Sequence, residues 1–122
     1  MATAISEAFE KAKRDEISKA ELTVTLLEND VVVPANTKVV LGKEYLEPIR
    51  MEIAGVIHMA VFDSTDSFEK SDVGADTALI TPAGGLLYTV PDEYGIAVNT
   101  TEGFFSIDPV ALAGLRKLNP KN

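Results

Sequence analysis

The sequence contains no cysteine, no tryptophan and a single histidine. Without cysteine the chain cannot form a disulfide, a zinc–thiolate site or a thiol nucleophile. No apolar run approaches the roughly eighteen residues of a membrane-spanning helix, and the N-terminal residues lack the pattern of a secretory signal. These absences predict a cytoplasmic protein.

Basic residues are in the minority. The chain has 11 Lys and Arg against 19 Asp and Glu, which gives a formal net charge of −8 at pH 7. Nucleic acid binding depends on clustered basic residues that neutralise phosphates, and anionic membrane surfaces repel an acidic protein. The composition therefore predicts that the protein binds neither nucleic acid nor a membrane.

The acidic residues are concentrated in one stretch. Between Val61 and Asp108, nine of the ten charged residues are acidic, so this stretch carries a net charge of −8 and the rest of the chain is balanced. One interpretation is that the excess only keeps the protein soluble. The other is an acidic face that attracts a basic protein partner. The residues predicted for that face are Asp63, Asp66, Glu69, Asp72, Asp76, Asp92, Glu93 and Tyr94, with Tyr88 and Phe104 as further aromatic contacts if they are exposed, although Phe104 also fits core packing.

Apolar periodicity divides the first part of the chain into elements. Ile5, Ala8 and Phe9 have helical spacing. Farther on, apolar residues alternate with Thr23 and Thr25, which is typical of a strand. The predicted elements are a helix over residues 3–14, strands over 22–26 and 31–33 with a tight turn at Asn29-Asp30 between them, and mostly loop over 35–48, where Val39–Leu41 is alternatively a short strand before Gly42.

The second part of the chain is punctuated by glycine, proline and capping residues. Gly55 separates two apolar runs, Ser64 is a predicted N-cap, and Asp108 followed by Pro109 predicts the start of a helix. The predicted elements are strands over 49–53 and 56–62, a short helix after Ser64, an extended segment over 77–80, helix or strand over 83–90, strands over 95–100 and 103–107, and a helix from 109 to 118.

The chain is predicted to be one domain, residues 1–122, because it has no internal repeat, low-complexity tract or long linker. Helices at both ends bracket a series of strands. The predicted fold class is therefore α+β, with a mostly antiparallel or mixed sheet, N-terminal and C-terminal helices, and one or two short internal helices.

Four segments resemble one known family when they are taken in order. They are Leu26–Pro34, which ends in Val-Pro; Met59–Phe68, an apolar strand leading into a short helix; Gly85–Leu87 with Gly95–Asn99 after a short gap; and Phe105–Leu115, a closing strand and helix. This order is similar to that of the N-terminal domain of the SseB proteins, a family named for enhanced serine sensitivity. The four segments cover most of the chain.

The resemblance implies an α+β domain of poorly defined biochemistry, and it carries over no catalytic residue. The chain departs from the family pattern at two positions: Asp63 stands where the family commonly has Thr, and Thr100 follows Asn99 where Pro is frequent.

No group of residues has the spacing of a catalytic, metal or phosphate site. His58 lies in an apolar run and fits a packing residue of the sheet, and Ser64 has no GxSxG sequence around it. The aspartates after residue 62 lack the EF-hand pattern, and Gly84-Gly85 lacks the lysine of a phosphate loop. We therefore predict no catalytic residue, no cofactor and no metal.

The predicted function is that of a non-catalytic protein-interaction module that presents its acidic face to a partner, for example as an inhibitor or adaptor of a basic protein. The alternative is a small hydrolase or metal-dependent enzyme that uses His58 and nearby carboxylates. A third hypothesis is a homodimer formed through an exposed strand edge.

Overall fold

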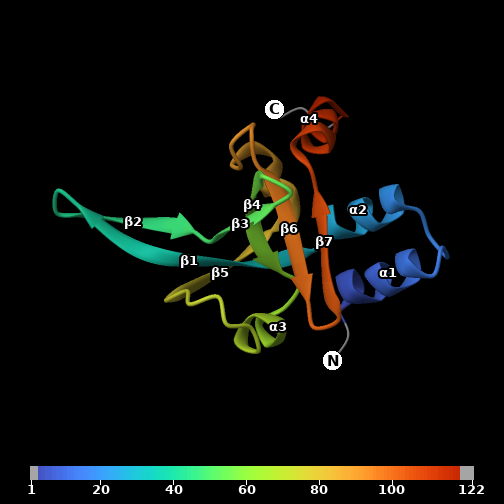
Figure 1. Ribbon diagram of the computed structural model, residues 1–122, viewed down its shortest axis with the longest axis horizontal. Coiled ribbons are helices and arrows are strands. Elements are labelled where there is room, and N and C mark those ends of the chain that lie inside the picture. Colours follow the sequence, from blue (N-terminus) through green and yellow to red (C-terminus); the bar gives the residue numbers. More distant parts are fainter. Residues whose placement is uncertain (1–2, 119–122) are drawn as a thin grey trace.

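The computed structural model describes residues 3–118, which form helices packed around a mixed sheet of seven strands (Figure 1). The α+β class predicted from the sequence is confirmed, with a helix at each end of the described chain. The predicted first helix is α1 (Ala4–Lys13), and its N-cap Thr3 forms a capping box with Ser6.

The strand predicted over residues 22–26 is wrong, because this stretch lies within helix α2 (Lys19–Leu27). The helix begins with a capping box in which Ser18 Oγ accepts the Glu21 N–H at 3.1 Å and the Glu21 carboxylate accepts the Ser18 N–H at 3.2 Å. The leucines that flank the alternating stretch are one helical turn apart, and both are buried. The spacing of the apolar residues is therefore compatible with both a strand and a helix, and the capping box favours the helix. The predicted turn at Asn29-Asp30 marks the end of this helix rather than a strand-to-strand connection.

The loop predicted over residues 35–48 is also wrong. Strand β1 (Asp30–Val40) continues through Pro34, and β2 (Lys43–Pro48) returns antiparallel to it. Leu41 and Gly42 form the turn, with φ of 52° and 78°. The prediction failed because neither face of this ribbon is covered, so no alternation of apolar and polar residues marks it. We call residues 36–48 the arm, which projects from the body in Figure 1.

The predicted pair of strands after the arm is confirmed as β3 (Arg50–Ile53) and β4 (Val56–Phe62), joined by a turn at Ala54-Gly55. Ile49 lies between the β1–β2 ladder and the β3–β4 ladder and hydrogen-bonds to both β1 and β4. Its N–H donates to the Pro34 carbonyl at 3.0 Å, and its carbonyl accepts the Ala60 N–H at 2.9 Å. One bent stretch of chain therefore hydrogen-bonds first to β1 and then to β4.

The remaining strands extend the sheet on both sides. The parallel pair of β4 and β6 (Gly95–Thr100) forms its centre. β7 (Gly103–Ile107) pairs antiparallel with β6, and β5 (Thr77–Pro82) pairs antiparallel with the first half of β1. The segment left open between helix and strand forms a 3₁₀ helix, η1 (Ala83–Tyr88). The remaining helices are α3 (Thr65–Glu69) and α4 (Pro109–Leu118).

The main core lies between one face of the sheet and α1, α2, η1 and α4. Ile5, Leu26 and Leu112 from three of these helices are almost completely buried, together with Val61 of β4 and Val98 of β6. Successive residues of a strand point to opposite faces of the sheet. On the face away from the main core, Phe68 of α3 packs edge-on against Phe62, with ring centroids 5.6 Å apart.

Gly95 is the glycine whose replacement the core tolerates least. A Cβ at this position would lie 2.4 Å from His58 Cδ2 and 2.6 Å from the Ile107 carbonyl oxygen. We expect Gly95→Ala to lower the free energy of unfolding by about 1–3 kcal/mol, because a ring and a backbone atom would both have to move. Gly114→Ala is the matched control: it has no neighbour within 4 Å, lies inside α4, and should raise stability by about 0.5–1 kcal/mol. Urea unfolding of both variants checks this, and equal stabilities would contradict it.

Candidate functional site

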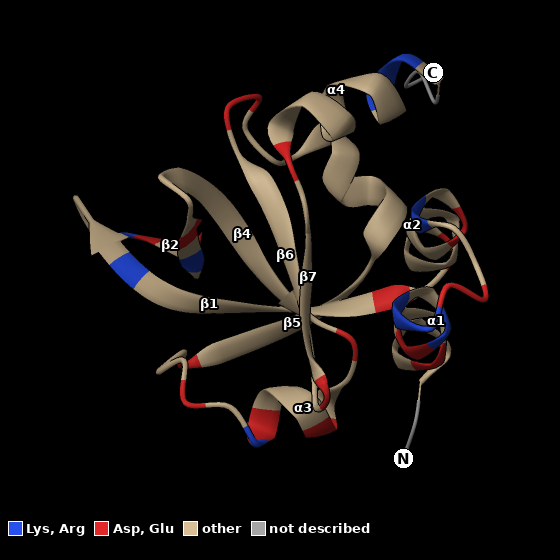
Figure 2. Cartoon of the chain, turned by 45° about the vertical axis from the view of Figure 1, so that its right-hand side comes forward, with Lys and Arg blue, Asp and Glu red and all other residues tan. Residues whose placement is uncertain are grey.

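The structure places the eight residues predicted for an acidic face in two groups rather than one. Asp63 follows the last residue of β4, whereas Asp92 precedes the first residue of β6. Because β4 and β6 are parallel, these positions lie at opposite ends of the sheet, as the red segments of Figure 2 show. We call the first set the α3 acidic group and the second the β6 group. The former comprises Asp63, Asp66, Glu69, Asp72 and Asp76, and the latter comprises Asp92, Glu93 and Tyr94.

Asp63 is an internal structural residue. Its side chain is buried, and it accepts hydrogen bonds from Thr3 Oγ1 at 2.5 Å and from Ser67 Oγ at 2.6 Å. Thr3 is also the N-cap of α1, and Ser67 lies in the first turn of α3. The carboxylate therefore ties the starts of two helices together and presents little surface to a partner.

The exposed members of the α3 acidic group are Asp66, Glu69, Asp72 and Asp76. Asp66 forms an ion pair with Lys70 at 3.0 Å, one helical turn away. Three further exposed carboxylates, those of Glu69, Asp72 and Asp76, therefore exceed the local basic charge on α3 and the segment that leads to β5. In Figure 2, α3 and the chain next to it show several red segments and little blue.

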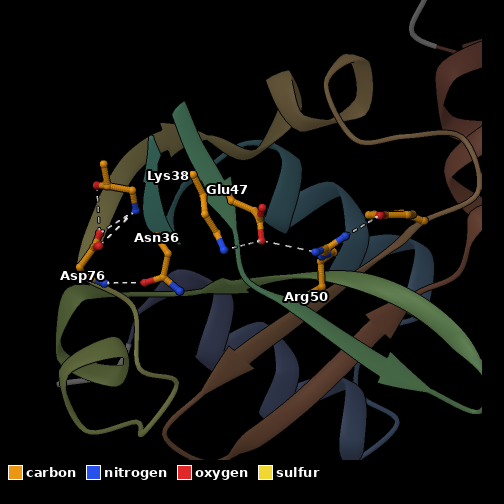
Figure 3. Close-up of polar contacts among 7 residues, drawn as sticks. Asn36, Lys38, Glu47, Arg50 and Asp76 are labelled. Atoms are coloured by element: carbon orange, nitrogen blue, oxygen red, sulfur yellow. Dashed lines mark hydrogen bonds and ion pairs between the residues drawn. The ribbon is translucent and has the colours of Figure 1, made fainter. Parts of the chain in front are cut away.

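Asp76 ends the pairing of β1 with β5. Both its carboxylate oxygens lie 3.1 Å from the Thr37 nitrogen, and its own N–H donates to Asn36 Oδ1 at 3.0 Å (Figure 3). Thr77 Oγ1 also donates to Asp76 Oδ1, at 2.8 Å. The hydrogen bond from the Thr77 hydroxyl and that from the Thr37 N–H hold the pKa of Asp76 below its usual value. Asp76 is thus a side-chain cap at the base of the arm.

The β6 group is joined to in-chain cations. Asp92 lies 3.6 Å from Arg116 of α4, and Glu93 beside it is exposed. The Tyr94 hydroxyl accepts a hydrogen bond from Arg50 Nη1 at 3.3 Å, and this contact raises the pKa of Arg50. Tyr94 is therefore tied to β3 through Arg50, whereas the Asp92 side chain is 95% exposed in spite of its contact with Arg116.

A short line of charges continues from Arg50 into the arm. Arg50 Nη2 lies 3.4 Å from Glu47 Oε1, and the same oxygen lies 4.0 Å from Lys38 Nζ (Figure 3). Glu47 and Lys38 come from opposite strands of the arm and lie on one face of it. These partners are about half exposed, so each ion pair contributes little energy, but together they orient one face of the ribbon.

His58 has the contacts of a packing residue. Its side chain is 3% exposed, Nδ1 donates to the Val56 carbonyl at 2.9 Å, and the ring fills the space above Gly95. Ser64, the other candidate for catalysis, is the N-cap of α3 and accepts the Ser67 N–H at 3.1 Å. Among residues 3–118, no cluster of three or more His, Cys, Asp or Glu side chains could hold a metal ion.

The two aromatic residues added to the predicted face lie apart. Phe104 pairs with Asn99 at the end of the sheet where α3 lies, and half of its side chain is exposed, so it does not belong to the core. Tyr88 ends η1 and lines a hollow together with residues of α2 and α4.

The arm is the most prominent surface that the sequence did not indicate. Every residue from 37 to 48 is exposed. Five of these residues are large and apolar, which is the opposite of what a solvated loop would carry. Leu41 at the turn is 97% exposed, and the other four are Val39, Val40, Tyr45 and Leu46. The signal available in the sequence was the Leu41-Gly42 pair between residues that favour strands.

A second apolar surface is concave and lies among the helices. A hollow of about 560 Å³ between α2 and α4 is lined by Val24, Ala111, Leu115 and Leu118, among others. It lies on the helical side of the molecule, whereas the arm projects from the opposite side (Figure 1).

The chain matches no family model, no curated protein and no solved structure. The resemblance to the SseB N-terminal domain therefore stays a prediction. In the described part of the chain, no helix combines the length and apolar character needed to cross a membrane.

The buried carboxylate of Asp63 predicts a difference between two neighbouring aspartates. Asp63→Asn replaces a charged acceptor of two hydroxyl groups, so we expect the free energy of unfolding to fall by about 1–3 kcal/mol. Asp66→Asn, on the exposed side of α3, should change it by no more than about 0.5 kcal/mol. Urea unfolding at neutral pH compares them, and a larger loss for the Asp66 variant would refute the assignment of Asp63.

The lowered pKa of Asp76 predicts a response to acid. Thr77→Val removes the largest cause of the shift, so the pKa of Asp76 should rise toward its usual value of about 4. Because the pKa is lowered in the folded state, the stabilisation is complete above the unfolded-state pKa and is lost as the pH falls through the folded-state pKa. The stability difference between wild type and the variant should therefore shrink with acidification. A carbon-detected NMR titration measures the pKa, with Thr81→Val as the control that should leave it unchanged.

Proposed function

We propose that this chain is a non-catalytic protein-interaction module whose partner contacts the arm. The observation that carries the proposal is the exposure of large apolar side chains on both faces and at the turn of a ribbon that projects from the body. Several large apolar side chains exposed on one projecting element are typical of an interaction site. The monomer gains little from these side chains, since each of them is 46–97% exposed.

The backbone at the turn of the arm supports the same proposal. Leu41 has φ of 52°, in the left-handed region, where residues other than glycine and asparagine are disfavoured by about 1–2 kcal/mol. The β3–β4 turn has almost the same geometry, with φ of 51° at Ala54. A large apolar residue is thus retained at a strained and fully exposed position. Its side chain is best explained by a contact outside the monomer.

The surroundings of the arm indicate the chemistry of the partner. Asp76 is hydrogen-bonded to the base of the arm, and the exposed Glu69 and Asp72 precede it in the chain. A partner with an apolar cleft bordered by basic residues would match an apolar tip beside an acidic base. The predicted acidic face thereby becomes the border of the interface, limited to the α3 acidic group.

Leu41→Asn tests this proposal, because asparagine suits the left-handed turn and removes the apolar tip. We expect its thermal stability to equal or exceed that of wild type, while binding of a basic protein captured by the wild type falls at least tenfold. The matched control is Ala54→Asn, which introduces asparagine at the same backbone geometry without removing a large apolar side chain, and it should keep full affinity.

The measurement is calorimetric titration of the captured, purified partner into each variant at low and high salt. Affinity that falls with salt supports the acidic border. Unchanged binding by Leu41→Asn would refute the role of the arm, and binding that is indifferent to salt would refute that of the acidic group.

A further inference from the structure

We propose that the open edge of β5 pairs antiparallel with β5 of a second copy of this chain, across a two-fold axis. This inference goes beyond the partner proposed for the arm and uses another surface. β5 hydrogen-bonds to β1 on one side, and in the described chain no strand pairs with its other side. The edge is therefore a ready template for a further strand.

The register of β5 on β1 determines which backbone groups face outward. Ala83, directly after β5, donates its N–H to the Asn29 carbonyl at 3.0 Å. Hydrogen-bonded and non-hydrogen-bonded pairs alternate along an antiparallel ladder. Val31–Thr81, Val33–Leu79 and Ala35–Thr77 are thus the hydrogen-bonded pairs. The N–H and carbonyl groups of Ala78 and Ile80, and the carbonyl of Pro82, must therefore point away from β1.

The outward groups are complementary to themselves in one antiparallel register. With Ala78 opposite Ile80 of the second copy, the two-fold axis passes beside Leu79, and every outward N–H and carbonyl of Ala78 and Ile80 finds a partner. A register centred on Ile80 would instead place Ala78 opposite Pro82, which has no N–H, and would leave the Ala78 carbonyl unpaired. The first register is therefore the one we infer.

The side chains of β5 fit this register. Leu79 is 44% exposed and Ile80 is 68% exposed, on opposite faces of the strand. In the dimer Leu79 would lie beside its own copy, and Ile80 beside Ala78 of the second copy, so both would lose exposed apolar area. Residues 77–82 carry no charge, whereas the free edge of β2 has Lys43, Glu44 and Glu47. The Asp76 carboxylate would face Pro82 of the second copy rather than another acid, so the pairing opposes no like charges.

A single cysteine reports this pairing directly, because the natural chain has none. At the two-fold axis, Leu79 and its copy form a non-hydrogen-bonded pair with Cα atoms about 4.5 Å apart, a separation that a disulfide spans. We expect Leu79→Cys to form a disulfide-linked dimer under mild oxidation at least tenfold faster than Ile57→Cys, a control of similar exposure on β4. Thermal unfolding of the reduced variants verifies that both are folded.

Sedimentation equilibrium gives the second measurement. Ala78→Pro removes one outward N–H from each copy and leaves the ladder to β1 intact, so we expect the dimer dissociation constant to rise about thirtyfold. Ala78→Val keeps the N–H and should dimerise like wild type. Leu41→Asn should also dimerise like wild type, which separates this result from the test of the arm.

Three results would overturn the inference. They are a monomer at every concentration with no preferential cross-linking of Cys at position 79, equal dissociation constants for the proline and valine variants, and faster cross-linking of Ile80→Cys than of Leu79→Cys. If Ala78→Pro does not fold, the cross-linking rates alone decide. Capture of an unrelated extended peptide by β5 in place of a second copy would likewise count against it.

Discussion

Backbone hydrogen bonding by β1 is the constraint on which the rest of this structure depends. This one strand pairs with β5 on one side and with β2 and the end of β4 on the other, so it connects every part of the sheet. Pro34 lies in its middle and has no N–H to donate. The strand continues because Pro34 stands in a non-hydrogen-bonded pair with Ala78, and on the other side only its carbonyl is used, by Ile49. A proline is compatible with the strand at this position because the alternation of hydrogen-bonded pairs requires no N–H from it.

The arm results from the length of β1. Its first half is buried between helices and neighbouring strands, whereas its second half extends beyond them with β2 as its companion. A two-stranded ribbon is only marginally stable by itself, so the groups at its base matter. Asp76 takes the Thr37 N–H where pairing with β5 ends, and Glu47 joins Arg50 of β3 to Lys38. Polar contacts at the base therefore hold an element whose far end is apolar.

The elements that could be predicted from the sequence are those in which local and tertiary signals agree. α4 begins where Asp108 and Pro109 indicate, and Asp108 Oδ1 accepts the Ala111 N–H at 2.8 Å. β6 and β7 have the predicted bounds because they are bordered by glycines and one face is buried. α2 was mistaken because alternation with Thr23 and Thr25 outweighed a capping box, although both hydroxyls donate to carbonyls four residues earlier in a helix. Periodicity cannot detect the arm, because a ribbon that buries neither face has no period.

The candidate site shows a similar division. The excess of acid after residue 61 was visible as composition, but composition does not distinguish a carboxylate that a partner can reach from one that the fold uses. Asp63 and Asp76 accept hydrogen bonds from hydroxyl and N–H groups, whereas the Asp92 side chain is 95% exposed near Arg116. The sequence also does not show that these acids lie in two places. The parallel pairing of β4 with β6 puts Asp63 and Asp92 at opposite ends of the sheet.

The net charge of −8 and the exposed apolar residues act together rather than in conflict. Leu41, Ile80 and their neighbours would favour indiscriminate association if the protein were neutral, since exposed apolar patches and uncharged strand edges are both prone to it. An overall negative charge opposes random encounters between copies, and this repulsion is weak at contact when the opposed groups are neutral or basic. Association then requires that strand edges align in register, or that a partner offers basic groups beside an apolar cleft. The negative charge therefore disfavours contacts that are not aligned, while the hydrogen bonds and the buried apolar side chains contribute the binding free energy of the aligned ones.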